Sequence, residues 1–256
     1  MQRNEIVISI PHAGTFIPPA IRSMIPLSDE TLLHEPDLFT DRIYAVPEAR
    51  VVLAEFSRVI SDPNRAPDEI YTEGHMRAQG VVMLSQSHGL DTFENDPDLA
   101  TMEEWVKRFH KPFHDKLHRQ LNGASFLIDG HSMWSSGAPS SRSPGISRAD
   151  IVLGNREYSA CSAETTKFFR TYFEQCGYRV AVNNPFAGRY IIGSYANRFR
   201  IPGIQIEIKR SLYLDEQSLE AKEDTILTLH RQIDELLDAF CSWSNLHIVK
   251  HVTDLS

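Results

Sequence analysis

Short runs of apolar residues, many of them β-branched, recur along the chain and predict its strands. They lie at residues 6–10, 51–56, 81–84, 126–128, 151–153, 178–182 and 204–208. Because the runs are continuously apolar rather than alternating with polar residues, they are typical of strands covered on both faces. The pattern therefore predicts a sheet buried between two layers.

Apolar residues spaced three or four apart lie between these runs and predict helices. The clearest spans Met102 to Leu121, where Pro112 is expected to kink the helix. Two more are predicted from Ser159 to Cys176, just before Gly177, and from about Ser218 to Trp243. Strands alternating with helices favour a largely parallel sheet with helices on both sides. We therefore expect a three-layer α/β fold.

The composition is that of a globular protein, with 41% hydrophobic and 23% charged residues among 256, and we expect one domain over residues 1–256. A formal charge of -8 argues against nucleic-acid or membrane partners, and no apolar run approaches the roughly 18 residues of a membrane span. The three cysteines are far apart and lack CxxC spacing, so no disulfide framework is expected. A reducing cytoplasm is the predicted location.

Two histidines follow predicted strands directly, His12 after residues 6–10 and His131 after residues 126–128. Open α/β sheets bind ligands beyond the carboxyl ends of their strands, so the two imidazoles could share one ion. Imidazole is the commonest zinc ligand, and a catalytic zinc takes three protein ligands. Each histidine taken alone could equally be structural. The Ser, Gly and Pro-rich segment from Met133 to Arg148 is interpreted as an active-site loop or lid.

A carboxylate is the expected third ligand. Asp37 is favoured because it follows His12 without another strand intervening, and Asp41, one helical turn further on, is the alternative. Asp37 also follows Pro36, so it could instead be a carboxylate that stabilises the start of a helix.

The segment from Ser57 to Arg65 combines two arginines, an acid and an amide. The planar guanidinium of Arg65 could bind a substrate carboxylate through two parallel hydrogen bonds. An ion pair between Asp62 and Arg65 could equally fix a loop, and both interpretations can hold together if Asp62 orients Arg65.

Glu207 lies within the apolar run at 204–208, where a buried carboxylate is rare unless it is paired or functional. A partly desolvated glutamate has a raised proton affinity, which suits a general base. The alternative is that Glu207 pairs with a neighbouring Lys or Arg.

Other catalytic groups are less favoured. His110, His114 and His118 share one helix face, but a solvated or partly buried face explains them more simply than a metal site, and His114 is the one expected to reach the active site. No GxSxG elbow, phosphate-binding loop or dinucleotide-binding glycine pattern occurs, which disfavours a serine nucleophile.

The motifs PHAG, SRVISDPNR, DGHS and PGIQIEIKRSLY, in this order, resemble the N-formylglutamate amidohydrolase family over about residues 6 to 215. That family is similar in fold to the zinc carboxypeptidases and aspartoacylases. The resemblance therefore implies an α/β/α sandwich with a mixed, mostly parallel sheet and zinc at the strand ends.

The resemblance also implies roles for individual residues. His12 and His131 resemble the zinc histidines, and Asp37 matches an aspartate typical of the amidohydrolases. Glu207 resembles the catalytic acid. Asn64 and Arg65 resemble the pair that binds the substrate carboxylate, and Asp62 fits the position that orients the arginine. Arg189, or alternatively Arg198, is expected to supply a second positive charge, and Tyr190 is a further expected substrate-binding residue.

The sequence thus leads to a zinc-dependent hydrolase that cuts the amide bond of a small acidic N-acyl amino acid, with N-formyl-L-glutamate as the expected substrate. Zinc, or another divalent metal, and Arg58 are expected to stabilise the oxyanion, while Glu207 acts as general base. The alternatives are a zinc carboxypeptidase or deacylase with another acyl or peptide substrate, and a non-catalytic protein that binds an acidic metabolite.

Overall fold

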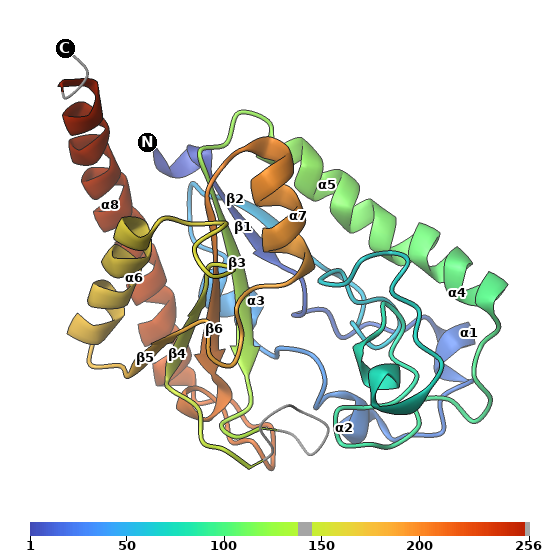
Figure 1. The fold of residues 1–256 in the computed structure, drawn as a ribbon. Helices are drawn as coiled ribbons and strands as arrows, with labels where there is room; N and C mark the ends of the chain where they lie inside the picture. Colours follow the sequence, from blue (N-terminus) through green and yellow to red (C-terminus); the bar gives the residue numbers. More distant parts are fainter. Residues whose placement is uncertain (138–144, 254–256) are drawn as a thin grey trace.

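A computed structural model of the chain describes residues 1–137 and 145–253, and its centre is one six-stranded sheet (Figure 1). The strands follow the order β2-β1-β3-β6-β4-β5. Their bounds are β1 (Ile6–Ile10), β2 (Arg50–Leu53), β3 (Phe126–Met133), β4 (Ile151–Gly154), β5 (Val180–Val182) and β6 (Gly203–Lys209). Strands β2, β1, β3 and β6 are mutually parallel, β4 is antiparallel to β6, and β5 is parallel to β4. The mixed, mostly parallel sheet is confirmed.

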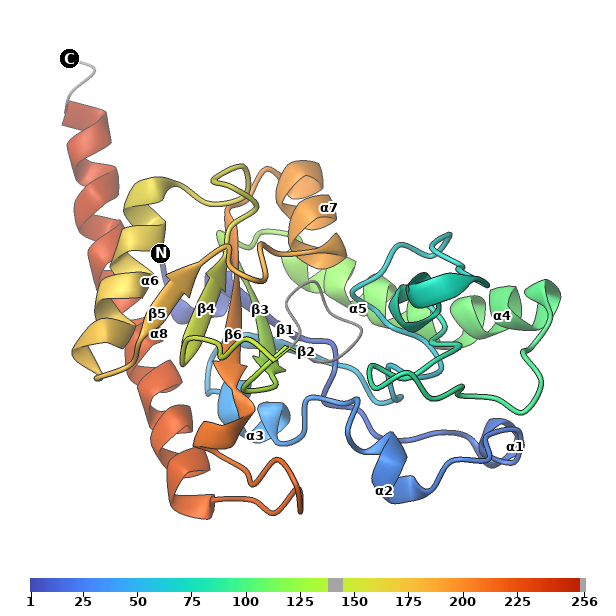
Figure 2. The ribbon, with the colours of Figure 1, turned by 60° about the horizontal axis from the view of Figure 1, so that its bottom comes forward.

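Helices cover both faces of this sheet (Figures 1 and 2). One layer contains α3 (Thr40–Tyr44), α6 (Ala163–Gln175) and α8 (Glu223–Thr253), and the other contains α5 (Lys111–Leu121) and α7 (Tyr190–Phe199). In β1, Ile6 and Ile8 face the first layer and Val7 faces the second, and all three are fully buried. Burial on both faces explains the continuous apolar runs, and the three-layer arrangement is confirmed.

A third apolar cluster lies beside the sheet, on the right of Figure 1. The short helices α1 (Pro19–Arg22), α2 (Asp29–Leu32) and α4 (Leu99–Trp105) contribute to it, and the chain also forms the 3-10 helix η2 (Gly74–Gln79). Two further 3-10 helices, η1 (Arg3–Glu5) and η4 (Arg210–Leu212), precede β1 and follow β6. This third cluster supports the loop segments that approach the strand ends from outside the sheet.

The prediction of a strand at residues 81–84 is wrong. The segment is buried, but its backbone bonds to loops: the Val81 amide donates to the Glu69 carbonyl and the Met83 amide donates to the Val59 carbonyl. A short apolar run does not by itself distinguish a strand from a buried loop of the third cluster.

The helix predictions are confirmed with changes at their ends. The segment from Met102 to Leu121 comprises α4, a π-helical turn η3 (Val106–His110) and α5, with the Lys111 amide bonded to the Val106 carbonyl just before Pro112. Helix α6 is capped by the Ser162 hydroxyl and ends before Gly177, which has φ +93°. Helix α8 starts later than expected and runs further, and α7 was not predicted.

Residues 138–144 of the expected lid lie outside the described part of the chain, and Met133 belongs to β3. Within the described residues, no helix combines the length and apolar character needed to cross a membrane.

Candidate metal centre and active site

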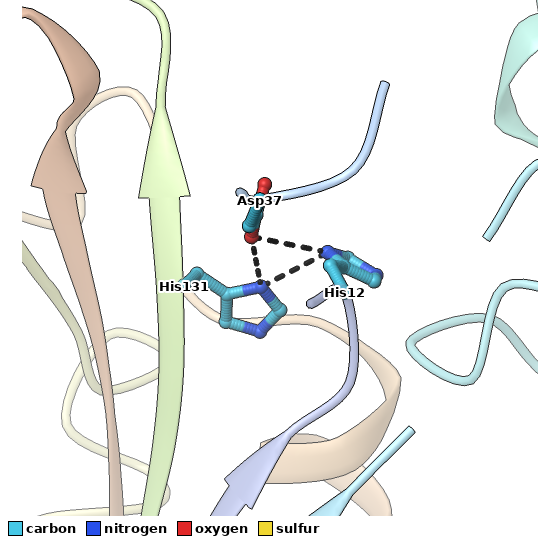
Figure 3. Close-up of side chains that lie close together, drawn as sticks. All are labelled: His12, Asp37 and His131. Atoms are coloured by element: carbon cyan, nitrogen blue, oxygen red, sulfur yellow. Dashed lines mark hydrogen bonds and ion pairs between the residues drawn. The ribbon is translucent and has the colours of Figure 1, made fainter. Parts of the chain in front are cut away.

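Three side chains from separate parts of the sequence meet at the carboxyl ends of the central strands (Figure 3). His12 follows β1, His131 lies near the end of β3, and Asp37 lies in the loop between α2 and α3. The Nδ1 atoms of the two histidines are 3.1 Å apart, and they lie 3.5 Å (His12) and 3.4 Å (His131) from Asp37 Oδ2. All three side chains are buried.

These separations match those of ligands around one zinc ion. Zn–N and Zn–O bonds of about 2.0–2.2 Å in a tetrahedron put neighbouring ligand atoms roughly 3.3–3.6 Å apart. Three such ligands leave a fourth position for water or substrate, the arrangement of catalytic rather than structural zinc. Among the described residues this is the group of His, Cys, Asp and Glu side chains that could hold a metal, and Asp41 is not part of it.

The outer nitrogens of both rings are bonded to carboxylates. His12 Nε2 lies 2.7 Å from Asp62 Oδ1, and His131 Nε2 lies 2.9 Å from Asp129 Oδ2. An ionised carboxylate only accepts hydrogen bonds, so each Nε2 carries a proton, and with a metal bound each ring would be neutral and present its Nδ1 lone pair inward. Two facing lone pairs repel each other unless a cation lies between them, and the donor set therefore fits a divalent metal.

Electrostatics also favour a positive charge at this point. Burial alone would lower the pKa of His131, but the carboxylates of Asp129 and Asp37 raise it well above its usual value. Burial alone would raise the pKa of Asp37, but its hydrogen bonds with His12 and His131, together with the charge of Arg210, hold it well below its usual range. A carboxylate that stays ionised while buried is the form needed to bind a metal.

Asp37 is fixed in place by the strands beside it. Its Oδ1 accepts a hydrogen bond of 2.8 Å from Arg210 Nη2, and its Oδ2 accepts one of 3.0 Å from the Ser132 amide. The Asp37 amide in turn donates to the His12 carbonyl at 2.8 Å. These bonds hold the carboxylate near both imidazoles, and they do not support the alternative in which Asp37 mainly stabilises a helix start.

Glu207 lies beside the three ligands. It pairs in register with His131 across β3 and β6, and its side chain is only 7% exposed. Burial raises the pKa of Glu207 to about 7, and Gln205 Nε2 donates to its Oε1 at 2.9 Å. Within the described residues no Lys or Arg forms an ion pair with Glu207. The neighbouring Lys209 and Arg210 pair with Asp150 and Asp37 instead, so the sequence alternative of a simple ion pair does not hold.

The Ser57 to Arg65 segment contributes a network around Asp62. Asp62 Oδ2 binds Arg58 Nη2 at 2.6 Å and lies 3.6 Å from Arg65 Nη1, while its Oδ1 binds His12. Arg65 donates to the carbonyls of Gln79 and Asn64 at 2.8 and 2.9 Å, and burial lowers its pKa to about 10. Asp62 therefore links both arginines to His12.

Asn64 connects this loop to the centre of the sheet. Its Oδ1 accepts a hydrogen bond of 3.0 Å from the Ile191 amide at the start of α7. Its Nδ2 contacts His131 Nε2 at 3.2 Å without a hydrogen bond, because both nitrogens are donors when His131 Nε2 is bonded to Asp129. Arg189 approaches the loop through Gln79, whose Oε1 accepts from Arg189 Nη1 at 3.3 Å. Tyr190 packs edge-on against His114, with ring centroids 5.4 Å apart.

An open cleft of about 620 Å³ borders this centre. Trp134, which follows β3, lines the cleft and stacks on His34 with ring centroids 5.5 Å apart. The Arg210 guanidinium lies 4.7 Å from the centroid of the Trp134 ring and also binds Asp37. A single side chain therefore separates the wall of the cleft from a ligand of the proposed metal.

Sequence reasoning assigned no role to three residues of this centre: Asp129, Gln205 and Arg210. Asp129 and Gln205 each lie two residues before a predicted site residue on the same strand, and positions two apart face the same side of a sheet. That spacing was a usable signal for both. Arg210 lies beyond β6, and its contact with Asp37 depends on how distant segments pack.

Comparison with known proteins gives consistent findings. The family model described as N-formylglutamate amidohydrolase matches residues 4–214, which include every candidate site residue. The chain is 25% identical to an N-formylglutamate deformylase of Pseudomonas putida and 24% identical to one of Pseudomonas aeruginosa, with 94% of both chains covered in each case.

Solved structures agree on the fold. The crystal structure of an N-formylglutamate amidohydrolase from Ralstonia eutropha has a TM-score of 0.83 at 24% identity, with 95% of each chain covered. A gene product of Agrobacterium tumefaciens has a TM-score of 0.68 at 18% identity, with 92% of this chain and 91% of that chain covered. At these identities the structural likeness shows a shared fold.

Proposed function

The chain belongs to the N-formylglutamate amidohydrolase family, and from this premise we propose that it is a metal-dependent enzyme that hydrolyses N-formyl-L-glutamate to L-glutamate and formate. The observation that carries the proposal is the spacing of His12, Asp37 and His131, whose ligand atoms lie 3.1 to 3.5 Å apart. The names of the two Pseudomonas relatives support the choice of substrate.

We assign the metal to these three side chains, with zinc as the proposed ion. A zinc ion bound there would polarise the scissile carbonyl and lower the pKa of a water toward about 7. Asp62 and Asp129 act on the two imidazoles as positioning residues, because each carboxylate fixes the ring orientation and the protonated nitrogen.

Glu207 is the proposed general base and acid. Burial brings its pKa to about 7, so at neutral pH it can accept a proton from the attacking water and return that proton to the leaving amine. Its position beside His131 on the neighbouring strand is what this role requires. Gln205 holds one carboxylate oxygen and leaves the other for the proton transfer.

Arginines surround the reacting groups. Arg58 has a buried Nε for which the described residues provide no hydrogen-bond partner, and we assign it to the oxyanion. Asn64 and Arg65 are the proposed binding pair for the substrate α-carboxylate, with Arg189 and Tyr190 completing that side of the site. Asp62 positions both Arg58 and Arg65.

We keep the cytoplasm as the proposed location and a single catalytic domain as the proposed organisation.

The test is hydrolysis of a panel of N-acyl amino acids by the purified protein before chelation, after chelation and after zinc is restored. We expect N-formyl-L-glutamate to be the best substrate, with turnover lost on chelation and recovered with zinc. A preference for a longer acyl group or a peptide would instead indicate a deacylase or carboxypeptidase. Tight binding of acidic metabolites without any turnover by the zinc-loaded protein would refute catalysis.

A further inference from the structure

Arg148 is a buried guanidinium that lacks an anionic partner among the described residues. Its side chain is 9% exposed, and its Nη1 donates to the Trp134 carbonyl at 3.0 Å. Its Nε is buried and has no hydrogen-bond partner in the part of the chain that the structure describes, and its Cζ lies 4.8 Å from the centroid of the Phe186 ring. One backbone carbonyl and one aromatic face leave most of its hydrogen-bonding capacity unused.

The other buried arginines of the site differ in this respect. Arg58 binds Asp62 at 2.6 Å, and Arg210 binds Asp37 at 2.8 Å. Arg65 lies 3.6 Å from Asp62 and donates to two further carbonyls. Burying a charge without a partner is unfavourable, so an unpaired buried guanidinium implies that its anion comes from a ligand.

The location of Arg148 connects it to the reacting groups. Its guanidinium donates to the carbonyl of Trp134, which lies three residues after His131 in the chain. Burial lowers the pKa of Arg148, an effect that the charges of Glu207 and Glu216 oppose and that of Arg210 reinforces. Arg148 therefore lies against Trp134, just beyond the carboxyl end of β3, and within the electrostatic influence of the proposed general base.

Arg65 belongs to a different segment, the loop that contains Asp62 and Asn64. The charged groups that influence it are Asp62, Arg58, Arg189 and Glu69, which lie on the loop and helix segments attached to His12 and α7. Arg65 lies in the loop that contains Asp62, whereas Arg148 lies against Trp134 beyond β3, so the two guanidinium groups belong to different segments around the ligand cluster. Two separated guanidinium groups match a substrate that carries two carboxylates.

We propose that Arg148 is a specificity-determining residue that binds the side-chain carboxylate of an N-acyl dicarboxylic amino acid, while Asn64 and Arg65 bind the α-carboxylate. The inference rests on the proposed function and names Arg148 as a residue that selects the substrate of that reaction. The fork of a guanidinium fits a carboxylate through two parallel N–H···O bonds, and the free Nε of Arg148 supplies one of these donors.

The kinetic test compares N-formyl-L-glutamate with N-formyl-L-glutamine, which have the same size and differ by one charge. We expect Arg148→Met to lower kcat/KM for the glutamate substrate by roughly 100-fold and to change the glutamine value little, because only the acid loses a buried charge partner. Arg148→Lys should fall between, since lysine keeps the charge without the planar fork. An equal loss on both substrates would overturn the assignment.

A matched control is Arg170→Gln, which removes a half-exposed arginine on α6 that pairs with Glu174. It should leave both kinetic values unchanged. The melting temperature of Arg148→Met without ligand should equal or exceed that of the wild type, because the substitution removes an unpaired buried charge. A fall of more than about 5 °C would show that Arg148 serves the fold instead.

Equilibrium binding separates this inference from the proposed function. Calorimetric titration of the zinc-loaded protein with L-glutamate and with L-glutamine requires no turnover. We expect the wild type to prefer glutamate by at least tenfold and Arg148→Met to lose that preference, even if the catalysed reaction proves to be a different one. A wild type that binds both ligands equally would refute the role of Arg148.

Discussion

At the scale of single residues, the site is built from buried ionisable groups whose partners fix their protonation. Asp62 and Asp129 each hold the outer nitrogen of an imidazole, so the inner nitrogens face one another at 3.1 Å. Glu207 differs because the described residues give its carboxylate an amide donor but no cation within ion-pair distance. A buried acid in that environment holds its proton near neutral pH, as proton transfer to and from a substrate requires.

This difference leads to a prediction for Glu207→Gln. We expect kcat to fall roughly 100- to 10,000-fold while metal content and melting temperature stay at the wild-type level, because the amide fills the same space but cannot accept the proton. Initial rates on N-formyl-L-glutamate, metal analysis and thermal melting check this. Glu220→Gln, at an exposed position after β6, serves as the control. Full activity in Glu207→Gln would refute the role.

At the scale of elements, the strand ends and the helix around Pro112 decide where the site forms. His12, His131 and Glu207 were predicted because each belongs to or directly follows an apolar run, and the parallel strands β1, β3 and β6 bring such positions to one edge. The sequence favoured His114 as the helix histidine that reaches the site, but its partners could not be predicted, because they lie in the loop before Asn64 and on α7. His110 Nε2 and His114 Nε2 donate to the carbonyls of Arg65 and Pro63, each at 2.9 Å, and so fix the loop that carries Asn64.

The helix contact predicts a pH dependence of stability. Burial lowers the pKa of His114 to about 3, and the Tyr195 hydroxyl donates to its unprotonated Nδ1 at 2.8 Å. In the unfolded chain this histidine has a pKa near 6.5, so below about pH 6.5 the unfolded state binds a proton that the folded state does not bind. Stability therefore falls as the pH drops, by about 2 kcal/mol from this residue at pH 5.

Denaturant unfolding of the wild type and of His114→Gln at several pH values between 7.5 and 5 measures this contribution. Glutamine keeps a donor for the Pro63 carbonyl but does not titrate, so its stability should decrease less on acidification. The values at pH 7.5, where the wild-type imidazole is neutral in both states, provide the reference. If the free energy of unfolding changed with pH equally in the two proteins, His114 would not be a buried neutral imidazole.

At the scale of the whole molecule, the sheet is a scaffold and the third apolar cluster supplies much of the site. The layers and most strands could be predicted because burial on both faces leaves continuous apolar runs. The loop segments of the third cluster, such as residues 81–84, could not, since they are buried without a helical or strand period. Asp62, Asn64 and Arg65 lie in this loop region, so their geometry depends on packing between segments distant in sequence.

The most direct test of the account is the metal content of the purified protein, measured by elemental analysis together with that of Asp37→Ala and Asp41→Ala. We predict one equivalent of divalent metal in the wild type and in Asp41→Ala, and a loss of metal and activity in Asp37→Ala, because Asp37 Oδ2 lies within 3.5 Å of both imidazole Nδ1 atoms. Full metal content in Asp37→Ala, or full activity of a metal-free wild type, would contradict the proposed centre.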